Sequence, residues 1–370
     1  MMKGSSDHTK RSLSLVVVLI ALWLPAGVHA LSVEGLYEAE IPVEGQSEAE
    51  RNRAYREGLA QVLVKASGQP GVLQHPRVRS AMSDAAGYVE EVSYRTALTT
   101  PIPEPGEPMP APVQQAFLTL RLSEDAVEAL LLDTDSGVWD RNRPAVLLWL
   151  VVQEVSGQRR LLSSDSGHPA LSVVNQFSRE RAVPFQIPLL DLTDRRALSV
   201  EQVWGLDEEA IREASARYGA STILAGRMLE TADGGYVGAW QFHFRDQTET
   251  FNHIDTEVTP FMEHPLDQAT VRMAEYFALS REDLDQEERL EVRIDNVGSL
   301  QAHASVLRYV RSLSVVNGVH VSQLDGDRLD MTLRVAGGAR RLGEFIRLDR
   351  DLEQAGDDDG EPSLHYRWTR

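Results

Sequence analysis

The run Ala145–Val152 reads AVLLWLVV, eight apolar residues in a row between Pro144 and Gln153. Eight residues suit a strand better than a helix, because helices of globular proteins usually need ten or more. A strand that is apolar on both faces belongs in the middle of a sheet, with helices covering both sides. Pro144–Gln153 therefore predicts an α/β fold built around one central strand.

The segment around this strand alternates strand-like and helical patterns, which defines a central α/β module at residues 141–285. Gly234-Gly235 indicates a hairpin turn between two of its strands. The expected helices are Ala170–Arg181, Leu206–Arg217 and Phe261–Phe277, and the expected strands are Val183–Leu190, Ser221–Leu229 and Tyr236–Phe244.

Residues 31–140 predict a smaller N-terminal α/β module. Ser47 is placed to cap a helix that runs to Ala66 and stops at Gly68. The loop 100–112 contains six prolines, so we interpret it as an extended surface connection, with a polyproline ligand for a partner groove as the alternative. Strands are expected at Leu36–Val43, Val89–Leu98 and Ala116–Leu122, with a weak helix at 76–85 and a short helix ending near Leu132.

Residues 286–355 follow a strand–helix–strand–strand–helix order, which predicts a ferredoxin-like C-terminal module. Its last helix, Gly337–Leu352, carries interleaved charges that indicate a salt-bridged solvent face. Residues 356–370 indicate a solvated acidic tail; calcium binding is disfavoured, because the adjacent Asp357, Asp358 and Asp359 cannot all point at one ion. The basic residues of the expected solvent face are Arg340, Arg341, Arg347 and Arg350.

The first thirty residues predict a secretory signal peptide. A basic start is followed by the apolar run Leu13–Leu24, and Val28-His29-Ala30 offers small residues for cleavage after Ala30. Twelve apolar residues are too few to span a bilayer, which disfavours the alternative of an uncleaved anchor. We expect a periplasmic protein with no membrane span after cleavage and a charge of −21 in place of −19.

Composition narrows the function classes. The 370 residues include no cysteine, which excludes disulfides, thiol catalysis and lipid attachment to a cysteine. Acidic residues outnumber basic ones by 56 to 37, so nucleic acid is not an expected partner.

No phosphate-binding, dinucleotide-binding or nucleophile-elbow motif occurs, and no histidine spacing supports a metal site. Three clusters carry polar side chains that chemistry could use. We interpret Asp133–Gly137 as a linker turn rather than half a calcium loop, and Ser163–His168 as a polar loop rather than a triad. Glu90 and Glu91 are expected on opposite faces of a strand. No catalytic residue, cofactor or metal is therefore assigned.

An aromatic row, Tyr236, Trp240 and Phe242 with Phe244 continuing it, lies on one side of a predicted strand. Such a row fits the core side of an antiparallel strand, and a glycan- or peptide-binding surface is the alternative.

The run Tyr37–Ser47, the helix Ala54–Ala66 and the stretch Arg143–Leu150 resemble a family of exported proteins from Gram-negative bacteria, domain-of-unknown-function family 2066. The resemblance covers most of residues 31–280 and implies no catalytic residues. The first module is also similar to the N-terminal module of flagellar T-type periplasmic proteins. The middle one resembles the α/β module at the start of TolB and in lipoproteins for curli secretion and penicillin-binding-protein activation, although this chain lacks their lipidation cysteine.

These observations predict a soluble, non-enzymatic envelope accessory or assembly factor that acts through protein–protein contacts, with its partner and oligomeric state unspecified. One alternative is a hydrolase on an envelope substrate, which requires a polar cleft between modules. The other is a glycan- or peptide-binding module that uses the aromatic row.

Overall fold

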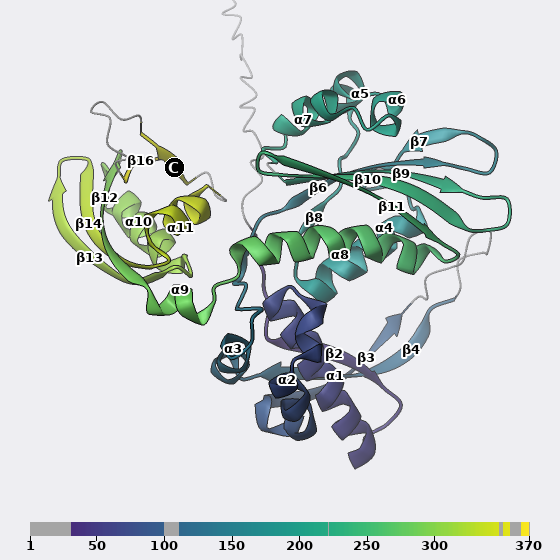
Figure 1. Ribbon diagram of the computed structural model, residues 1–370, viewed down its shortest axis with the longest axis horizontal. Coiled ribbons are helices and arrows are strands. Elements are labelled where there is room, and N and C mark those ends of the chain that lie inside the picture. The colour runs from purple at the N-terminus through teal and green to yellow at the C-terminus, as the bar shows by residue number, and fades with distance from the viewer. Residues whose placement is uncertain (1–30, 100–110, 221, 348–350, 356–363, 370) are drawn as a thin grey trace, which may run out of the picture.

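The structure is a computed structural model that describes residues 31–99, 111–220, 222–347, 351–355 and 364–369. The described residues form a mixed α/β fold with three sheets of three or more strands, each with its own helices (Figure 1). A two-stranded ribbon, β1 (Leu31–Ser32) with β5 (Asn142–Arg143), joins the start of the described chain to the stretch before the central strand. No described helix is both long and apolar enough to cross a membrane.

The N-terminal sheet is antiparallel and has the strand order β2-β4-β3. Helix α1 (Glu48–Ser67) covers one face of it, because Leu59, Leu63 and their neighbours pack against Leu118 and Leu120. Ser47 caps this helix and Gly68 ends it in a left-handed conformation, as the sequence predicts. The other elements are β2 (Glu38–Val43), η1 (Pro70–Gln74), α2 (Pro76–Ala81), η2 (Met82–Tyr88), β3 (Val89–Thr99), β4 (Val113–Leu122) and α3 (Glu124–Leu132).

The central strand, β6 (Val146–Gln153), is buried along both faces, which confirms the prediction from its apolar run. Val146, Leu148 and Leu150 join the core below the sheet, and Leu147 and Trp149 join a second core above it. Helices α4 (Pro169–Arg181) and α8 (Val258–Phe277) lie on the first face and α5–α7 on the second (Figure 1). The three small helices are α5 (Leu192–Ala197), α6 (Val200–Trp204) and α7 (Glu208–Ala216).

The sheet order is β11-β10-β9-β6-β7, with β8 beside β6. Strand β11 is missing from the sequence-based expectations, because it has little apolar alternation and lies at the edge. The strand expected at Val183–Leu190 is only two paired residues long. The remaining bounds are β7 (Arg159–Leu161), β8 (Phe185–Gln186), β9 (Thr222–Glu230), β10 (Tyr236–Phe244), β11 (Gln247–Asp255) and α9 (Arg281–Asp285).

The C-terminal sheet has the order β13-β14-β12-β16-β15, which is ferredoxin-like with one departure. Strand β16 runs parallel to β12 and separates it from β15, the strand that follows the last helix. The elements are β12 (Glu287–Asp295), α10 (Leu300–Ser312), β13 (Val316–Asp325), β14 (Arg328–Ala336), α11 (Gly338–Ile346), β15 (Leu352–Gln354) and β16 (His365–Trp368).

Two predictions for this end of the chain were wrong. The last helix stops at Ile346, and Leu352 lies in a strand. Residues 365–368 are not part of a solvated tail, because Tyr366 and Trp368 are buried in the C-terminal core. The acidic run Asp357–Asp359 lies outside the described residues.

Arg143 joins the N-terminal and central parts of the molecule. Its fully buried guanidinium donates to the carbonyls of Lys65 and Trp139, each at 2.7 Å, and to that of Arg181 at 3.0 Å. Lys65 lies in the last turn of α1 and Arg181 ends α4, so the negative ends of two helix dipoles face this cation. The two cores are thereby held against each other by a charged side chain that donates to backbone carbonyls on both sides.

Candidate functional site

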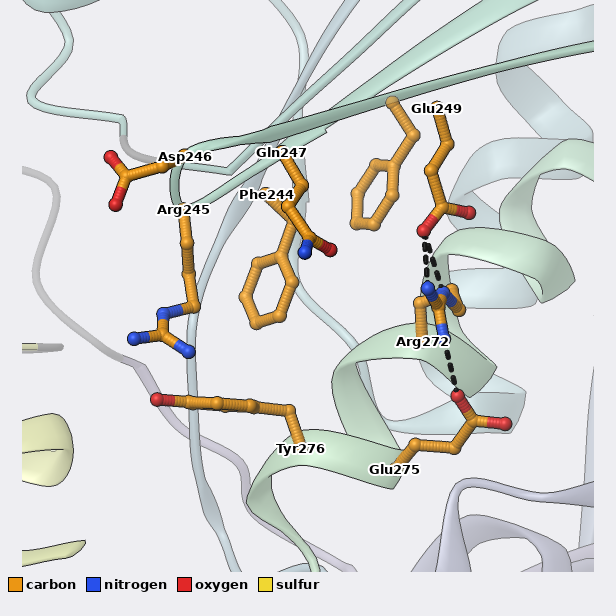
Figure 2. Close-up of a pocket in the computed structure, with 9 residues that line it drawn as sticks. Phe244, Arg245, Asp246, Gln247, Glu249, Arg272, Glu275 and Tyr276 are labelled. Carbon is orange, nitrogen blue, oxygen red and sulfur yellow. Dashed lines mark hydrogen bonds and ion pairs between the residues drawn. The ribbon is translucent and has the colours of Figure 1, made fainter. Parts of the chain in front are cut away.

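A pocket of about 400 Å³ opens between the β10–β11 turn and the last turns of α8 (Figure 2). Phe244 pairs with Gln247 in the hairpin, so Arg245 and Asp246 form a two-residue turn at its rim. The rings of Phe242 and Phe244 stack at 5.9 Å, and Tyr276 meets Phe244 edge-on at 5.5 Å. We call these surroundings the hairpin pocket; they combine aromatic rings with two guanidinium groups, of Arg245 and Arg272.

Arg245 adopts a backbone conformation that favours glycine, with φ of 57°. An L-residue with a side chain pays roughly 1–2 kcal/mol for this conformation. Its guanidinium lies over the Tyr276 ring, 4.3 Å from the centroid (Figure 2). Within the described residues it takes part in no ion pair, so its donors remain available at the rim of the pocket.

Arg272 forms the opposite wall and is held from two sides (Figure 2). Its Nη2 and Nε donate to Glu249 Oε1 at 2.5 and 2.8 Å, and its Nη1 donates to Glu275 Oε2 at 2.9 Å. These bonds raise the pKa of Arg272 further, so it stays charged and fixed. This wall is therefore a guanidinium paired with two carboxylates and not a source of protons.

Tyr276 contributes a neutral ring to the floor. Burial, followed by the facing Glu344 carboxylate, raises the pKa of Tyr276 to about 12. The hydroxyl therefore keeps its proton at neutral pH, and the ring serves as an apolar and cation-binding surface. The pocket lacks an activated nucleophile among its described lining residues, so its composition is that of a binding site.

A second hollow, of about 510 Å³, lies where α4, β11 and α8 meet Pro70 of the N-terminal part. Two of its residues, His253 and His264, stack with their ring centroids 4.1 Å apart. Burial and the neighbouring His253 lower the pKa of His264. Burial, then Glu180 and Asp267, raise the pKa of Glu263. We call this region the histidine groove; the pKa values of its His264 imidazole and its Glu263 carboxyl group are shifted in opposite directions.

The histidine groove is bounded by a strong ion pair. Arg181 of α4 contacts Asp267 of α8, and Arg181 also donates to the carbonyl of Gly68 at 3.0 Å. Among the described residues, no group of three or more histidine or acidic side chains is arranged to hold a metal ion. The groove can therefore offer proton transfer but shows no metal-binding geometry in the part of the chain described.

Residues 30–140 match a domain of unknown function, DUF8605. No curated protein matches the chain. The chain thus contains a domain of an uncharacterised family, and that DUF8605 region corresponds to the sheet β2-β4-β3 and its helices. Both candidate sites draw most of their residues from outside it.

Two polar clusters considered in the sequence lie at the end of the DUF8605 region and near its middle. Asp133 accepts bonds from Arg77 at 2.6 Å and Arg281 at 2.8 Å, so it links α2 to α9 and is engaged in structure. Glu90 and Glu91 do not lie on opposite faces: both contact Arg121, at 3.2 and 2.9 Å. A register shift between Val89 and Glu91 breaks the alternation, which explains why that prediction was wrong.

The Ser163–His168 cluster does not converge as a triad. Ser163 donates to Asp165 at 2.5 Å, whereas His168 caps α4 by accepting from the Ala170 amide and faces Glu230 at 3.4 Å. The histidine and the serine thus have different carboxylate partners. Burial, followed by the Arg160 charge, lowers the pKa of His168 to about 4, so it stays neutral as a cap.

The aromatic row is in the core. Tyr236, Trp240 and Phe242 are buried, and the first two pack against Phe261 of α8 at 5.4 and 6.1 Å. A glycan-binding surface built from this row is therefore wrong. Phe244, at its end, is half-buried and lines the hairpin pocket.

The last helix is not the fully solvated, salt-bridged face that the sequence predicts. Arg340 is exposed and pairs with Glu344 at 3.1 Å, but Arg341 and Glu344 themselves are buried. Arg341 donates to the carbonyls of Tyr276 and Ala278 at the end of α8. The predicted solvent face is thus partly a contact between the C-terminal and central parts, and Arg350 lies outside the described residues.

Neither site is predicted by the sequence alone. Arg245 and Tyr276 are far apart in the chain, and so are His253 and His264 from Glu180. The one local signal was Arg245-Asp246 directly after the alternating aromatic strand β10, where a glycine or asparagine is the usual turn residue.

Proposed function

We propose that this protein is an exported, non-enzymatic accessory protein of the Gram-negative cell envelope that binds segments of partner proteins. The observation that supports it best is the hairpin pocket, where Arg245 lies over Tyr276 beside Phe244. Arginine and tyrosine dominate the hot spots of protein interfaces, because each combines a large contact area with hydrogen-bonding groups. A partner segment would insert an apolar side chain against Phe244 and present a carboxylate to Arg245.

The strained backbone of Arg245 supports a role for its side chain beyond folding, since glycine would fit the turn without strain. Arg245→Gly separates the contribution of this side chain to folding from its contribution to partner binding. It is expected to leave the free energy of unfolding unchanged to within about 1 kcal/mol, because relief of strain offsets the lost contact with Tyr276. Capture of partners should fall at least tenfold if the guanidinium binds them.

The test is in-cell crosslinking with a photoreactive residue at Gln247, on the pocket lining, in the wild-type and Arg245→Gly backgrounds. The same photoreactive residue at Arg289, exposed on β12, is the matched control position. A recurrent adduct from Gln247 that disappears in the variant supports the proposal. Equal adducts at both positions, or adducts that survive Arg245→Gly, contradict it.

Export rests on the signal-like sequence of residues 1–30. If cleavage follows Ala30, the protein recovered from the periplasm begins at Leu31, and mass spectrometry of the intact chain measures this directly. We also propose that the chain is a member of domain-of-unknown-function family 2066, because most of residues 31–280 resemble that family. Recovery of the full-length chain from the cytoplasm alone would argue against export.

The histidine groove favours a second candidate, a hydrolase that uses general acid–base catalysis. His264 would act as the base and Glu263 as the acid, in line with the opposite shifts of their pKa values. Activity on envelope substrates that is lost in both His264→Gln and Glu263→Gln, and kept in Arg245→Gly, would favour this candidate over the first.

A further inference from the structure

Strand β3 leaves one of its edges open. It is the outer strand of the sheet β2-β4-β3, and β4 pairs with it along its whole length, from Val89 to Thr99. On the other side no described strand pairs with it. Alternate residues along this eleven-residue strand therefore present backbone donors and acceptors at the open edge, where another strand could pair with them.

The open edge carries apolar side chains on the face that α1 covers elsewhere in the sheet. Val92 and Tyr94 lie opposite Leu120 and Leu118 of the core, yet they are 38% and 39% exposed, because α1 does not extend over β3. Leu98 continues this face and is 74% exposed. The edge is thus apolar on one face as well as unpaired.

The opposite face carries charges of both signs. Glu91 contacts Arg121 of β4 at 2.9 Å, and Arg95 contacts Glu40 of β2. The two charges are four residues apart, so both point to the same face. Both side chains remain about half exposed or more, which leaves them room for a further partner.

We infer that β3 pairs with β3 of a second copy of this chain, antiparallel and about a two-fold axis at Ser93. This register places Glu91 opposite Arg95 of the second copy, and it does so twice. It also places Val92 opposite Tyr94 of the second copy on the apolar face. Opposite charges and aromatic–β-branched pairs are the combinations that stabilise neighbouring strands.

Neighbouring registers lack this match. An axis at Glu91 sets two glutamates against each other, and an axis at Arg95 sets two arginines against each other. With the axis at Val92 or Tyr94, both charges face uncharged side chains. At Ser93 the charges alternate across the joined sheets, from Arg121 through Glu91 to Arg95 of the second copy.

Charges on an edge strand often serve to prevent association. Here the two signs have a different consequence, because repulsion removes the registers centred at Glu91 and Arg95 while attraction favours the one centred at Ser93. The charges on β3 therefore select one pairing register and do not prevent pairing altogether. A protein strand of another sequence would meet the same charges without the guaranteed complement that a second copy carries.

The decisive experiment is a charge swap followed by sedimentation velocity over a concentration series. Glu91→Arg and Arg95→Glu each place like charges opposite one another, so the dissociation constant of each homodimer should rise about tenfold or more. A mixture of the two variants restores every pair, and so does the double variant E91R/R95E. Dimers in the wild type, the mixture and the double variant, with monomers in each single variant, support the inference.

A wild-type protein that stays monomeric, or a dimer that both single variants retain, overturns it. Ser93→Cys provides a second measurement, because the chain has no other cysteine. Oxidation should yield a disulfide-linked dimer of this chain, whereas the control Ser156→Cys, exposed in the β6–β7 turn, should not. Crosslinking of Ser93→Cys to a different protein in preference to a second copy would also contradict the inference.

Discussion

Arg143 shows how a single side chain can decide whether two folded parts stay together. It is fully buried, its Nε donates to the Asp140 carbonyl at 2.8 Å, and its guanidinium lies 4.2 Å from the Trp139 ring centroid. Burial lowers the pKa of Arg143 to about 9, so the group is still charged at neutral pH. Carbonyls at the ends of α1 and α4 accept hydrogen bonds from it, and the nearby Asp140 charge also favours its charged form.

Arg143→Met keeps a long unbranched side chain and removes every donor, so the Lys65, Trp139 and Arg181 carbonyls lose their partners. We expect the free energy of unfolding to fall by about 3 kcal/mol or more, measured by urea denaturation. Arg289→Met, at an exposed position, should change it by less than about 0.5 kcal/mol. A similar small loss in both variants would show that the carbonyls are satisfied by other means.

His243 predicts a pH dependence at the same scale. Its side chain is fully buried on β10, and burial, followed by the Arg212 charge, lowers its pKa to about 4. In the unfolded chain this imidazole binds a proton near pH 6.5, whereas in the folded chain it does so only near pH 4. The free energy of unfolding therefore decreases as the pH falls from 6.5 to 4.

His243→Asn removes this titration while its amide can still reach Thr248, the partner of His243 Nδ1 at 3.1 Å. Denaturation curves between pH 6.5 and pH 4 should show a slope smaller by up to about 1.4 kcal/mol per pH unit. His320→Asn, exposed on β13, should leave the slope as it is in the wild type. An unchanged slope in His243→Asn would mean that this histidine protonates in the folded state.

At the scale of elements, close packing between strands β9 and β10 depends on Gly226. Gly226 pairs with Trp240, and a Cβ added there would lie 2.2 Å from the Trp240 ring. Gly226→Ala must displace a fully buried indole, so it should lower the free energy of unfolding by about 1–3 kcal/mol. Gly45→Ala is the control, since nothing lies within 4 Å of its added Cβ. If the two variants unfold at the same denaturant concentration, the indole has an alternative position.

The same scale shows which elements a sequence can predict. Helix α1 has local signals at both ends, Ser47 and Gly68, and its bounds agree with the prediction. Strand β6 is identified by composition alone, because both of its faces are buried. Strand β11 has neither signal, and pairing with β10 determines it. The candidate sites follow the same rule, since Arg245 meets Tyr276 only after β11 and α8 have folded back.

At the scale of the whole molecule, Arg341 attaches the C-terminal sheet to the end of α8. It donates to the Tyr276 and Ala278 carbonyls and lies 3.6 Å from Asp283. Its neighbour Arg340 is 71% exposed. The sequence places both on one charged helix, and only the position of α11 against α8 separates a buried arginine from an exposed one.

Arg341→Ala should weaken this attachment, so that the C-terminal part unfolds before the rest of the molecule. We expect one calorimetric transition to become two, and limited proteolysis to cut faster near α9. Arg340→Ala should keep a single transition and the wild-type rate. A single transition in Arg341→Ala at the wild-type temperature would show that the apolar contact between Phe277 and Phe345 is sufficient.

The parallel pairing of β6 with β9 also determines when the central sheet can be completed during synthesis. Val146 pairs with Thr222, the first residue of β9. The most apolar strand of the molecule therefore has no β9 to pair with until more than seventy further residues have been made. An apolar strand that is exposed and unpaired during synthesis is prone to aggregate. A chain truncated after Gly219 should therefore precipitate, and one truncated after Ala278, which contains β9, β10, β11 and α8, should remain in solution. Strand β6, which lies at the centre of the folded sheet, is therefore also the segment that favours aggregation of the incomplete chain.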